Sequence, residues 1–370
     1  MMVYPQKVYE VAIGLIPGIG NSLTRQLISY CGSAENVFKA SKVKLKNIPY
    51  IGELIADQIV SNTVLPEAQK IVEKAEKFGA EIIFYTDKTY PNVLKHFDDS
   101  PSILYFKGNI PLNINKSIAI VGTRQATEYG KEITEKIIKE IAHLNVTIIS
   151  GLAYGIDIAA HKAALKYGLP TIGIMGSGLD IIYPAIHKST AMEMIQNGGI
   201  LTENTFGVKP DAPRFPERNR IIAGLADATI VIEASHKGGA LITAEIANSY
   251  NKEVYAVPGK IGDNYSSGCN TLIKNNKARI LESVEQLIEE MNWLETQPKN
   301  KKNIQQKVQI QLEPETQAVY DVLKIQKEIE MDDLAWKTGH SVNKLSSILL
   351  NMEFEGLIKP LPGKKFKIVD

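Results

Sequence analysis

Arginines that follow glycines or prolines in short motifs are the residues of this 370-residue chain best suited to chemistry, and that chemistry is anion binding. In the clearest motif, Phe-Pro-Glu-Arg-Asn-Arg, a proline-ordered turn leads into a helix whose first turn carries Arg218, Asn219 and Arg220. The helix dipole places partial positive charge at this end, which disfavours cations there. The arrangement is understandable if an anion normally binds at this position. We therefore predict that these residues, with Arg214 and Phe215 directly upstream, bind phosphate.

A structural role is the alternative for the same arginines. One of them could pair with Glu217 or Asp227 and stiffen the fold. Because locally unfavourable features tend to mark functional sites, the phosphate site is the preferred interpretation.

A second anion-binding motif is the turn Gly122-Thr123-Arg124, which follows the apolar run 117–121. Glycine permits a close approach of the backbone, threonine can hydrogen-bond an anion, and arginine can form a two-pronged contact with phosphate. The alternative is an ordinary turn with a surface arginine. A position at the carboxyl edge of a sheet favours the functional interpretation.

Paired glycines follow other apolar runs and can form nests of backbone N–H donors that suit phosphate. A lysine follows a further run of the same kind. These residues complete the predicted site, and they are Gly151, Gly155, Gly238, Gly239 and Lys260.

Asp157 and His161 lie one helical turn apart and could act as acid and base. No serine or cysteine nucleophile with a local signature accompanies them, so we expect them to pair with each other in a structural role.

Neither a dinucleotide fingerprint nor a phosphate-binding P-loop occurs in the chain, and its two cysteines make no zinc site by themselves. We predict no cofactor, no metal and no catalysis.

The elements that must position these loops alternate between short apolar runs and helical periods. Such alternation predicts a mostly parallel α/β sheet covered on both faces, with ligands beyond the carboxyl ends of the strands. The runs are 117–121, 147–149, 171–175, 228–232 and 253–257, and the helical periods are 130–143, 156–167 and 241–250.

Residues 1–80 read as short helices broken by turns at 14–20 and 48–52, where proline, an aliphatic residue and glycine precede a helix. This spacing resembles the helix-hairpin-helix motif, in which a helix N-terminus can hold a DNA phosphate. Packing or protein contact is the alternative. Tyr50 replaces the usual glycine of the second hairpin, which weakens the phosphate interpretation there.

The C-terminal part reads as a lysine-rich linker followed by a winged helix. Its third helix carries only Lys344 against Glu353 and Glu355, which argues against reading duplex DNA in a groove. A protein contact and a weak nucleic-acid contact through the wing lysines remain as alternatives. The linker spans 296–311, the winged helix 312–370 with helices at 315–324, 331–338 and 341–355, and Pro362-Gly363 turns the wing.

The charges nearly cancel, with 42 Lys and Arg against 41 Asp and Glu, which excludes a diffuse polycation. Residues 81–295 carry 21 basic and 24 acidic groups, so the region that contains the predicted phosphate site is itself net acidic. Binding must therefore rest on a focused pocket. No signal pattern or bilayer-spanning apolar stretch occurs, so we expect a cytoplasmic protein without a membrane partner.

Taken in order, the motifs resemble those of the DNA-processing protein A family (DprA, also called Smf), over roughly residues 81–290. The motifs are Val-Gly-Thr-Arg, Ser-Gly-Leu-Ala-Tyr-Gly-Ile-Asp, Tyr-Pro, Phe-Pro-Glu-Arg-Asn-Arg, Gly-Gly-Ala-Leu-Ile-Thr, Val-Pro-Gly and Gly-Cys-Asn-Thr-Leu-Ile.

The resemblance implies an extended Rossmann-like domain at 81–295 that binds single-stranded DNA, between an N-terminal helical domain and a winged helix. It further implies protection of that DNA, loading of the RecA recombinase in natural transformation, and a homodimer. It places Arg124, Arg218 and Arg220 in the DNA pocket, and dimer contacts near Leu272 and Ile273.

Two alternatives from other classes stay open. The Gly238-Gly239 element with Glu245 is similar to the loop of nucleoside-monophosphate phosphoribohydrolases, with Glu245 as an acid at the crevice. The chain could also be a scaffold with an inert core. If single-stranded DNA binds, Tyr154, Tyr183 and Phe215 are candidate stacking platforms, or simply wall and core.

Overall fold

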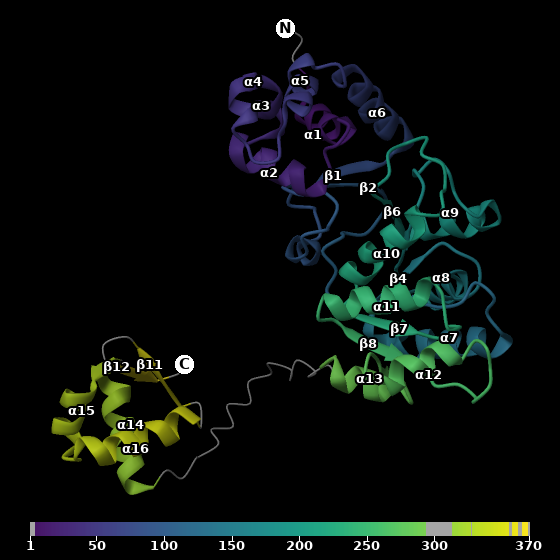
Figure 1. The fold of residues 1–370 in the computed structure, drawn as a ribbon. Helices are drawn as coiled ribbons and strands as arrows, with labels where there is room; N and C mark the ends of the chain where they lie inside the picture. The colour runs from purple at the N-terminus through teal and green to yellow at the C-terminus, as the bar shows by residue number, and fades with distance from the viewer. Residues whose placement is uncertain (1–3, 294–312, 327, 355–356, 362–364, 369–370) are drawn as a thin grey trace. The chain divides into compact units, whose positions relative to one another are not determined.

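The computed structural model describes residues 4–293, 313–326, 328–354, 357–361 and 365–368 (Figure 1). The chain falls into two compact units, Met1–Leu294 and Glu295–Asp370. The predicted linker at 296–311 lies outside the described residues.

Six helices open the first unit, and they include both predicted hairpins. Gly18 and Tyr50 occupy the same place in the two turns with φ angles of +83° and +62°, so the tyrosine adopts a conformation that favours glycine. The helices are α1 (Gln6–Leu15), α2 (Asn21–Cys31), α3 (Ala34–Lys39), α4 (Lys42–Lys46), α5 (Glu53–Ser61) and α6 (Leu65–Phe78).

These helices share one hydrophobic core with the edge of the sheet that follows. Val8 and Leu27 belong to the same buried cluster as Phe84 and Tyr105. The predicted boundary at residue 80 therefore marks the change from helix to strand inside a single unit.

The sheet has nine strands in the order β1-β2-β6-β5-β4-β3-β7-β8-β9. The seven strands from β6 to β9 are parallel, whereas β1 and β2 add antiparallel pairs at one edge. The strands are β1 (Glu81–Phe84), β2 (Ile103–Gly108), β3 (Ser117–Val121), β4 (Thr147–Gly151), β5 (Thr171–Ile174), β6 (Gly198–Thr202), β7 (Ala228–Val231), β8 (Glu253–Ala256) and β9 (Arg279–Ile280).

Helices cover both faces of the sheet, as the sequence predicts. Along β3, Ile118 and Ile120 join one buried cluster, and Ala119 and Val121 join the other. The first cluster contains side chains of α7 (Glu128–Ile141), α8 (Ile156–Lys166) and α13 (Val284–Glu290), and the second those of α10 (Arg214–Leu225), α11 (Gly239–Ser249) and α12 (Ser267–Lys274). The remaining helix of the sheet region is α9 (Lys188–Gln196), preceded by a short 3-10 helix, Ala185–His187, and two further 3-10 turns are Asn92–His96 and Ala142–Leu144.

The order in which strands are added to the sheet reverses at β3, although the strands themselves stay parallel. From β3 the chain proceeds outward through β4, β5 and β6, and then returns to the other side of β3 as β7, β8 and β9. The loops after β3 and β7 therefore diverge to opposite faces and leave a crevice between them, which is the usual place for a ligand.

The second unit is a winged helix, as expected. Its helices pack around Val319, Leu334, Leu345 and Met352. The elements are α14 (Pro314–Gln326), β10 (Ile329–Glu330), α15 (Met331–Thr338), α16 (Val342–Phe354), β11 (Ile358–Leu361) and β12 (Lys365–Ile368), with an antiparallel sheet in the order β10-β12-β11. The predicted turn at Pro362-Gly363 lies outside the described residues.

Candidate nucleic-acid interface

A cleft of about 910 Å³ lies at the crevice predicted by the strand order. The loops after β3, β4 and β7 and the first turns of α10 and α11 line it. It brings together eight of the predicted residues: Gly122, Thr123, Arg124, Phe215, Arg218, Asn219, Gly238 and Gly239.

Arg124 is an exposed cation in the lining of this cleft, as is Lys237, which directly precedes the start of α11. The Arg124 guanidinium lies 5.3 Å from the centre of the Phe215 ring, within range of a cation–π interaction. Among the described residues, no carboxylate forms an ion pair with Arg124. The full charge of Arg124 is therefore available to an anionic ligand.

The glycines of these loops make room for neighbouring groups. A Cβ on Gly122 would collide with the side chain of Ile156, and one on Gly155 would collide with the carbonyl of Thr123. Gly155 also has a φ angle of +77°, which favours glycine. These glycines thus permit the close approach of β3 to the start of α8 that holds Arg124 in place.

Arg218 differs from Arg124 because it is buried and paired. Its side chain is 6% exposed, its Nη1 donates to the carbonyl of Ile174, and its Nη2 lies 3.6 Å from Asp157 Oδ2. Burial lowers the pKa of Arg218 and raises the pKa of Asp157, while each charge favours the ionised form of the other. A Cβ on Gly151 would collide with this guanidinium, so Gly151 makes room for Arg218, and its predicted contact with DNA stays a prediction.

The expected pair between Asp157 and His161 is wrong. The ring of His161 is fully buried, with Nε2 donating to the carbonyl of Gly151 at 2.5 Å and Nδ1 lying 2.7 Å from Thr171 Oγ1. Burial lowers the pKa of His161 to about 4. Asp157 and His161 do lie one turn apart on α8, but Asp157 pairs with the buried Arg218 instead of with His161.

The start of α11 offers free backbone donors to the cleft. Gly238 forms the N-cap, which makes no side-chain capping bond, and the first turn holds no acidic residue. Asn219 Nδ2 donates to the carbonyl of Gly239 at 3.2 Å and fixes this start against α10. Unpaired N–H groups and the helix dipole together make it an anion-binding end.

A carboxylate already occupies the start of α7. Glu233, a buried residue after β7, accepts hydrogen bonds from the Thr127 amide at 2.9 Å and from the Thr127 hydroxyl at 2.5 Å. A Cβ on Gly130 would collide with the same carboxylate. We did not predict Glu233 from the sequence, and the only signal for it is an acid directly after an apolar run.

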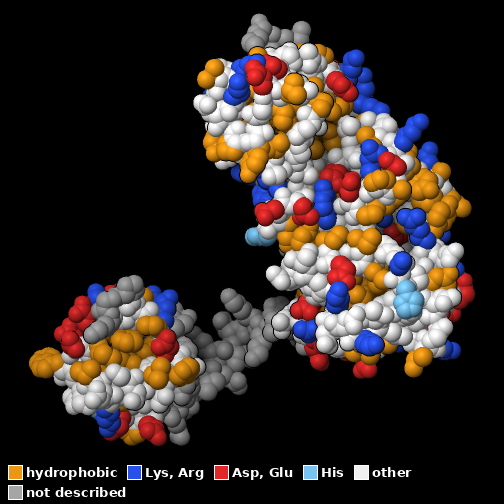
Figure 2. Space-filling view, viewed as in Figure 1, with side chains coloured by type: hydrophobic (Ala, Val, Ile, Leu, Met, Phe, Trp, Pro, Cys, Tyr) orange, Lys and Arg blue, Asp and Glu red, His pale blue; other side chains and the backbone are white. Residues whose placement is uncertain are grey.

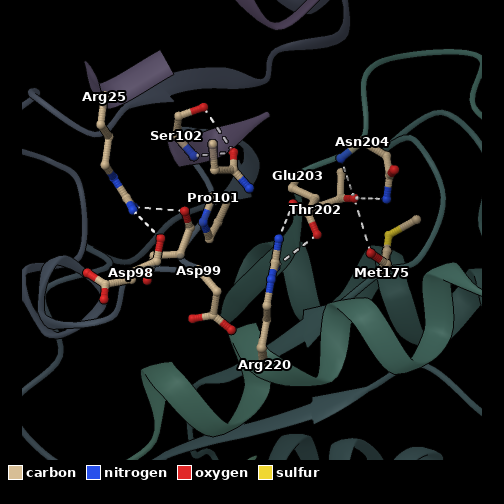
Figure 3. A network of polar contacts seen from close by, with 12 residues as sticks. Arg25, Asp98, Asp99, Pro101, Ser102, Met175, Thr202, Glu203, Asn204 and Arg220 are labelled. Atoms are coloured by element: carbon tan, nitrogen blue, oxygen red, sulfur yellow. Dashed lines mark hydrogen bonds and ion pairs between the residues drawn. The ribbon is translucent and has the colours of Figure 1, made fainter. Parts of the chain in front are cut away.

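Arg220 points away from the cleft, toward the end of β6 (Figure 3). It forms a two-pronged ion pair with Glu203, at 3.0 Å from Nη1 to Oε1 and 2.6 Å from Nη2 to Oε2. Burial lowers the pKa of Arg220, but Glu203 and Asp99 outweigh that effect and raise it. Its predicted contact with DNA stays a prediction, and its observed role is to anchor α10.

The loop that contains Asp99 also joins the N-terminal helices to the sheet (Figure 3). Arg25 of α2 donates to the carbonyls of Asp98 and Ser100, each at 2.7 Å. The Asp99 carboxylate accepts a hydrogen bond from the Tyr250 hydroxyl at 2.5 Å. This loop therefore braces α2 and the far end of α11 together.

Two predicted cations lie outside the lining of the cleft. Arg214 lies 3.8 Å from the carboxylate of Asp211 and donates to the carbonyl of Lys209 at 3.2 Å. Lys260 is exposed on the loop after β8. Their DNA contacts stay predictions.

The predicted dimer contacts differ from each other in exposure. Leu272 is 4% exposed and packs in the core, whereas Ile273 is half-buried. Only Ile273 thus has surface to offer, and the contact itself stays a prediction.

The aromatic candidates border the cavities. The rings of Tyr183 and Phe215 lie 5.8 Å apart, and both line the cleft. A smaller adjoining cavity of about 80 Å³ is lined by the same two rings and by Tyr154. Tyr265 also lines the cleft, and its hydroxyl donates to Gln125, a contact that the sequence did not suggest.

The geometry gives no support to the enzyme alternative. Glu245 is exposed, lies outside the lining of the cleft, and pairs with Lys277 at 2.7 Å.

In the part of the chain that the structure describes, no cluster of three or more potential ligands could hold a metal ion. Within that part, no helix combines the length and apolarity needed to cross a membrane.

Comparison with known families decides the relationship. Residues 81–292 match the model of the DNA recombination-mediator protein A, and residues 305–364 match the DprA winged helix domain. The chain belongs to the DNA recombination-mediator protein A family. The recognised motifs and the structure thus agree on the family and on its α/β core and winged helix.

Several relatives of this family match most of the chain. The Smf protein of Synechocystis is 28% identical across 99% of this chain and 100% of its own, and the DprA of Streptococcus pneumoniae is 39% identical across 56% and 73%. The solved S. pneumoniae DprA superposes with a TM-score of 0.68 at 31% identity, covering 78% of this chain and 99% of that one. A Helicobacter pylori DprA, whose structure was solved to explain its single-stranded DNA binding mode, gives 0.53 at 30% identity, covering 58% and 95%.

Proposed function

We propose that this chain binds single-stranded DNA in the cleft at the carboxyl edge of its sheet and acts there as a recombination mediator without catalysis. The observation that carries the proposal is the unpaired Arg124 over the Phe215 ring, close to the open start of α11. A cation, free N–H donors and an aromatic face are what sequence-independent recognition of a single strand requires.

The cleft suggests how a strand would be held. Arg124 and the first amides of α11 would bind phosphates, and Phe215 and Tyr183 would stack on bases. Arg218 lies below as a compensated charge that shapes the floor. The H. pylori relative, studied for its single-stranded DNA binding, supports the choice of ligand.

We further propose that the bound strand is protected and handed to the RecA recombinase, as in natural transformation, and that the chain works as a homodimer with contacts near Ile273. Membership of the recombination-mediator family supports this role. In a strand-exchange assay with DNA coated by a single-strand binding protein, the wild-type chain should accelerate joint-molecule formation by RecA. An Arg124→Ala chain should lose that acceleration in proportion to its loss of DNA binding.

Fluorescence anisotropy with a labelled oligothymidine tests the DNA-binding proposal itself. Arg124→Ala should weaken binding and reduce the dependence of log K on log salt by roughly 0.7, because one phosphate contact is lost. Lys139→Ala, which removes one exposed charge from the last turn of α7, is the matched control and should bind like wild type. Equal binding by the Arg124 variant and wild type would overturn the assignment of the site.

A further inference from the structure

A ridge of exposed apolar side chains borders the cleft on the side of β5. Tyr154 and Tyr183 are each 48% exposed, and Ile186, on the 3-10 helix Ala185–His187, is 73% exposed. The ring of Tyr154 lies 5.2 Å from the ring of His187, so the loop after β4 and the 3-10 helix are in contact. We call Tyr154, Tyr183 and Ile186 the tyrosine ridge.

The ridge is continuous with the cleft. Tyr183 lines both the cleft and the smaller adjoining cavity, and Tyr154 lines the smaller one. The two cavities also share Arg124 and Phe215 in their walls. A strand bound at Arg124 would therefore meet the rings of Phe215 and Tyr183 and then, in the smaller cavity, that of Tyr154.

The charge along the ridge suits an anionic strand. No acidic residue occurs between Asp180 and Glu193, and Asp180 is itself paired with Lys74 at 2.7 Å. Lys162 and Lys188 are exposed, and Lys162 is close enough to His187 to act on it electrostatically. Figure 2 shows hydrophobic side chains gathered on the surface around α9, with basic side chains beside them.

Exposed aromatic rings next to cations are the features with which proteins follow a single strand, whereas a protein partner would be expected to cover an apolar face without needing unpaired lysines. We propose that the strand held in the cleft continues over the tyrosine ridge, with bases stacked on Tyr154 and Tyr183 and phosphates near Lys162 and Lys188. This rests on the proposed function and extends the footprint of the site beyond the cleft.

Oligothymidines of two lengths test the extension in the full-length chain. One of about 4 nucleotides fills the cleft alone, and one of about 12 reaches the ridge. Tyr154→Ala combined with Ile186→Ser should weaken binding of the longer strand about tenfold and change the shorter by less than about twofold. Lys162→Gln combined with Lys188→Gln should reduce the salt slope by roughly 1.4 for the longer strand only.

Tyr129→Ala is the matched control, because Tyr129 is a 51% exposed tyrosine on α7 outside both cavities. It should bind both strands like wild type, and thermal unfolding should show that every variant stays folded. Unchanged binding of both strands by the ridge variants would overturn the proposal and leave the ridge to a protein partner. Equal weakening for both lengths would overturn the extension as well, whereas a wild-type chain that binds neither strand would refute the proposed function itself.

Discussion

The starts of α7 and α8 differ from the start of α11, although all three helices begin at the same edge of the same sheet. Glu233 lies at the first and Asp157 at the second, where its carboxylate accepts from the Ala153 amide at 3.3 Å. The start of α11 has neither a side-chain cap nor an acid in its first turn. At this edge of the sheet, carboxylates of the protein thus lie at the N-termini of α7 and α8, whereas the N-terminus of α11 has no such carboxylate.

This difference explains how a net acidic domain can hold an anion. Figure 2 shows acidic and basic side chains interspersed over the visible surface, without a broad basic face. The arginines follow the same division, since Arg218 and Arg220 are matched by Asp157 and Glu203, whereas Arg124 has no such partner among the described residues. Under the proposed function, the first phosphate contacts are therefore expected where Arg124 and the open start of α11 meet in the cleft.

Removal of the carboxylate at the start of α8 should have the largest effect. Asp157→Asn leaves the buried Arg218 without its counter-charge, so the free energy of unfolding should fall by about 3–5 kcal/mol. Asp211 is exposed, and its carboxylate contacts Arg214 and the Ala212 amide, so Asp211→Asn should change the free energy of unfolding by less than about 0.5 kcal/mol. Urea unfolding measures both, and equal stability of the Asp157 variant and wild type would show that the charge is not buried.

The histidine beneath this pair should make stability depend on pH. His161 has a pKa of about 4 in the folded chain, against 6.5 ordinarily, so the unfolded chain binds more protons between these values. Its contribution is complete above pH 6.5 and is lost as the pH falls toward 4, by about 3 kcal/mol in total. His161→Gln should remove this decrease in the free energy of unfolding between pH 6.5 and pH 4. An unchanged dependence of the unfolding free energy on pH would contradict the burial of His161.

The arginine that faces away from the cleft gives the next test. Arg220→Ala breaks a mostly buried two-pronged pair and should lower the free energy of unfolding by about 1–3 kcal/mol. Because Glu203 already pairs with Arg220, we expect the variant to lose no phosphate contact, so the salt slope of DNA binding should stay at the wild-type value even if affinity falls as α10 shifts. A slope reduced as in Arg124→Ala would place Arg220 on the DNA.

The smallest effect on stability is expected when the start of α11 is given a carboxylate like that at the start of α7. Gly239→Asp gives α11 a carboxylate at its start, as α7 already has, and should stabilise the helix by about 0.3–1 kcal/mol. The same change should weaken DNA binding by about tenfold or more, because the added charge occupies the anion site. Gly239→Ala is the control, since a Cβ there meets only ordinary contacts. Undiminished binding by the aspartate variant would exclude α11 from the site.

Much of this arrangement could be predicted from the sequence, because it rests on local patterns. The central strands follow from short apolar runs between turn residues, and their parallel order brings the glycine and arginine loops to one edge. The strands β1, β2, β6 and β9 were missed. β1 and β2 lie beside the core shared with the N-terminal helices, β6 begins with two glycines that strands disfavour, and β9 has only two residues.

Pairing between distant residues could not be predicted. The partner of Asp157 comes from α10 rather than from the next turn of its own helix, and Glu203 reaches Arg220 from the end of an unpredicted strand. A motif names the residues of a site but not which of them the fold neutralises. Only the three-dimensional structure separates Arg124 from the other two arginines.

Backbone NMR of the amide-labelled chain, titrated with a short oligothymidine, tests the central claim most directly. The amides of Gly239 and Ala240 at the start of α11 should shift with a common saturation curve. Those of Gly130 on α7 and Ile156 on α8 should shift far less, because the first already donates to Thr127 Oγ1 and the second to the carbonyl of Thr123. Equal shifts at all three helix starts, or none at α11, would contradict the account of a single open anion site.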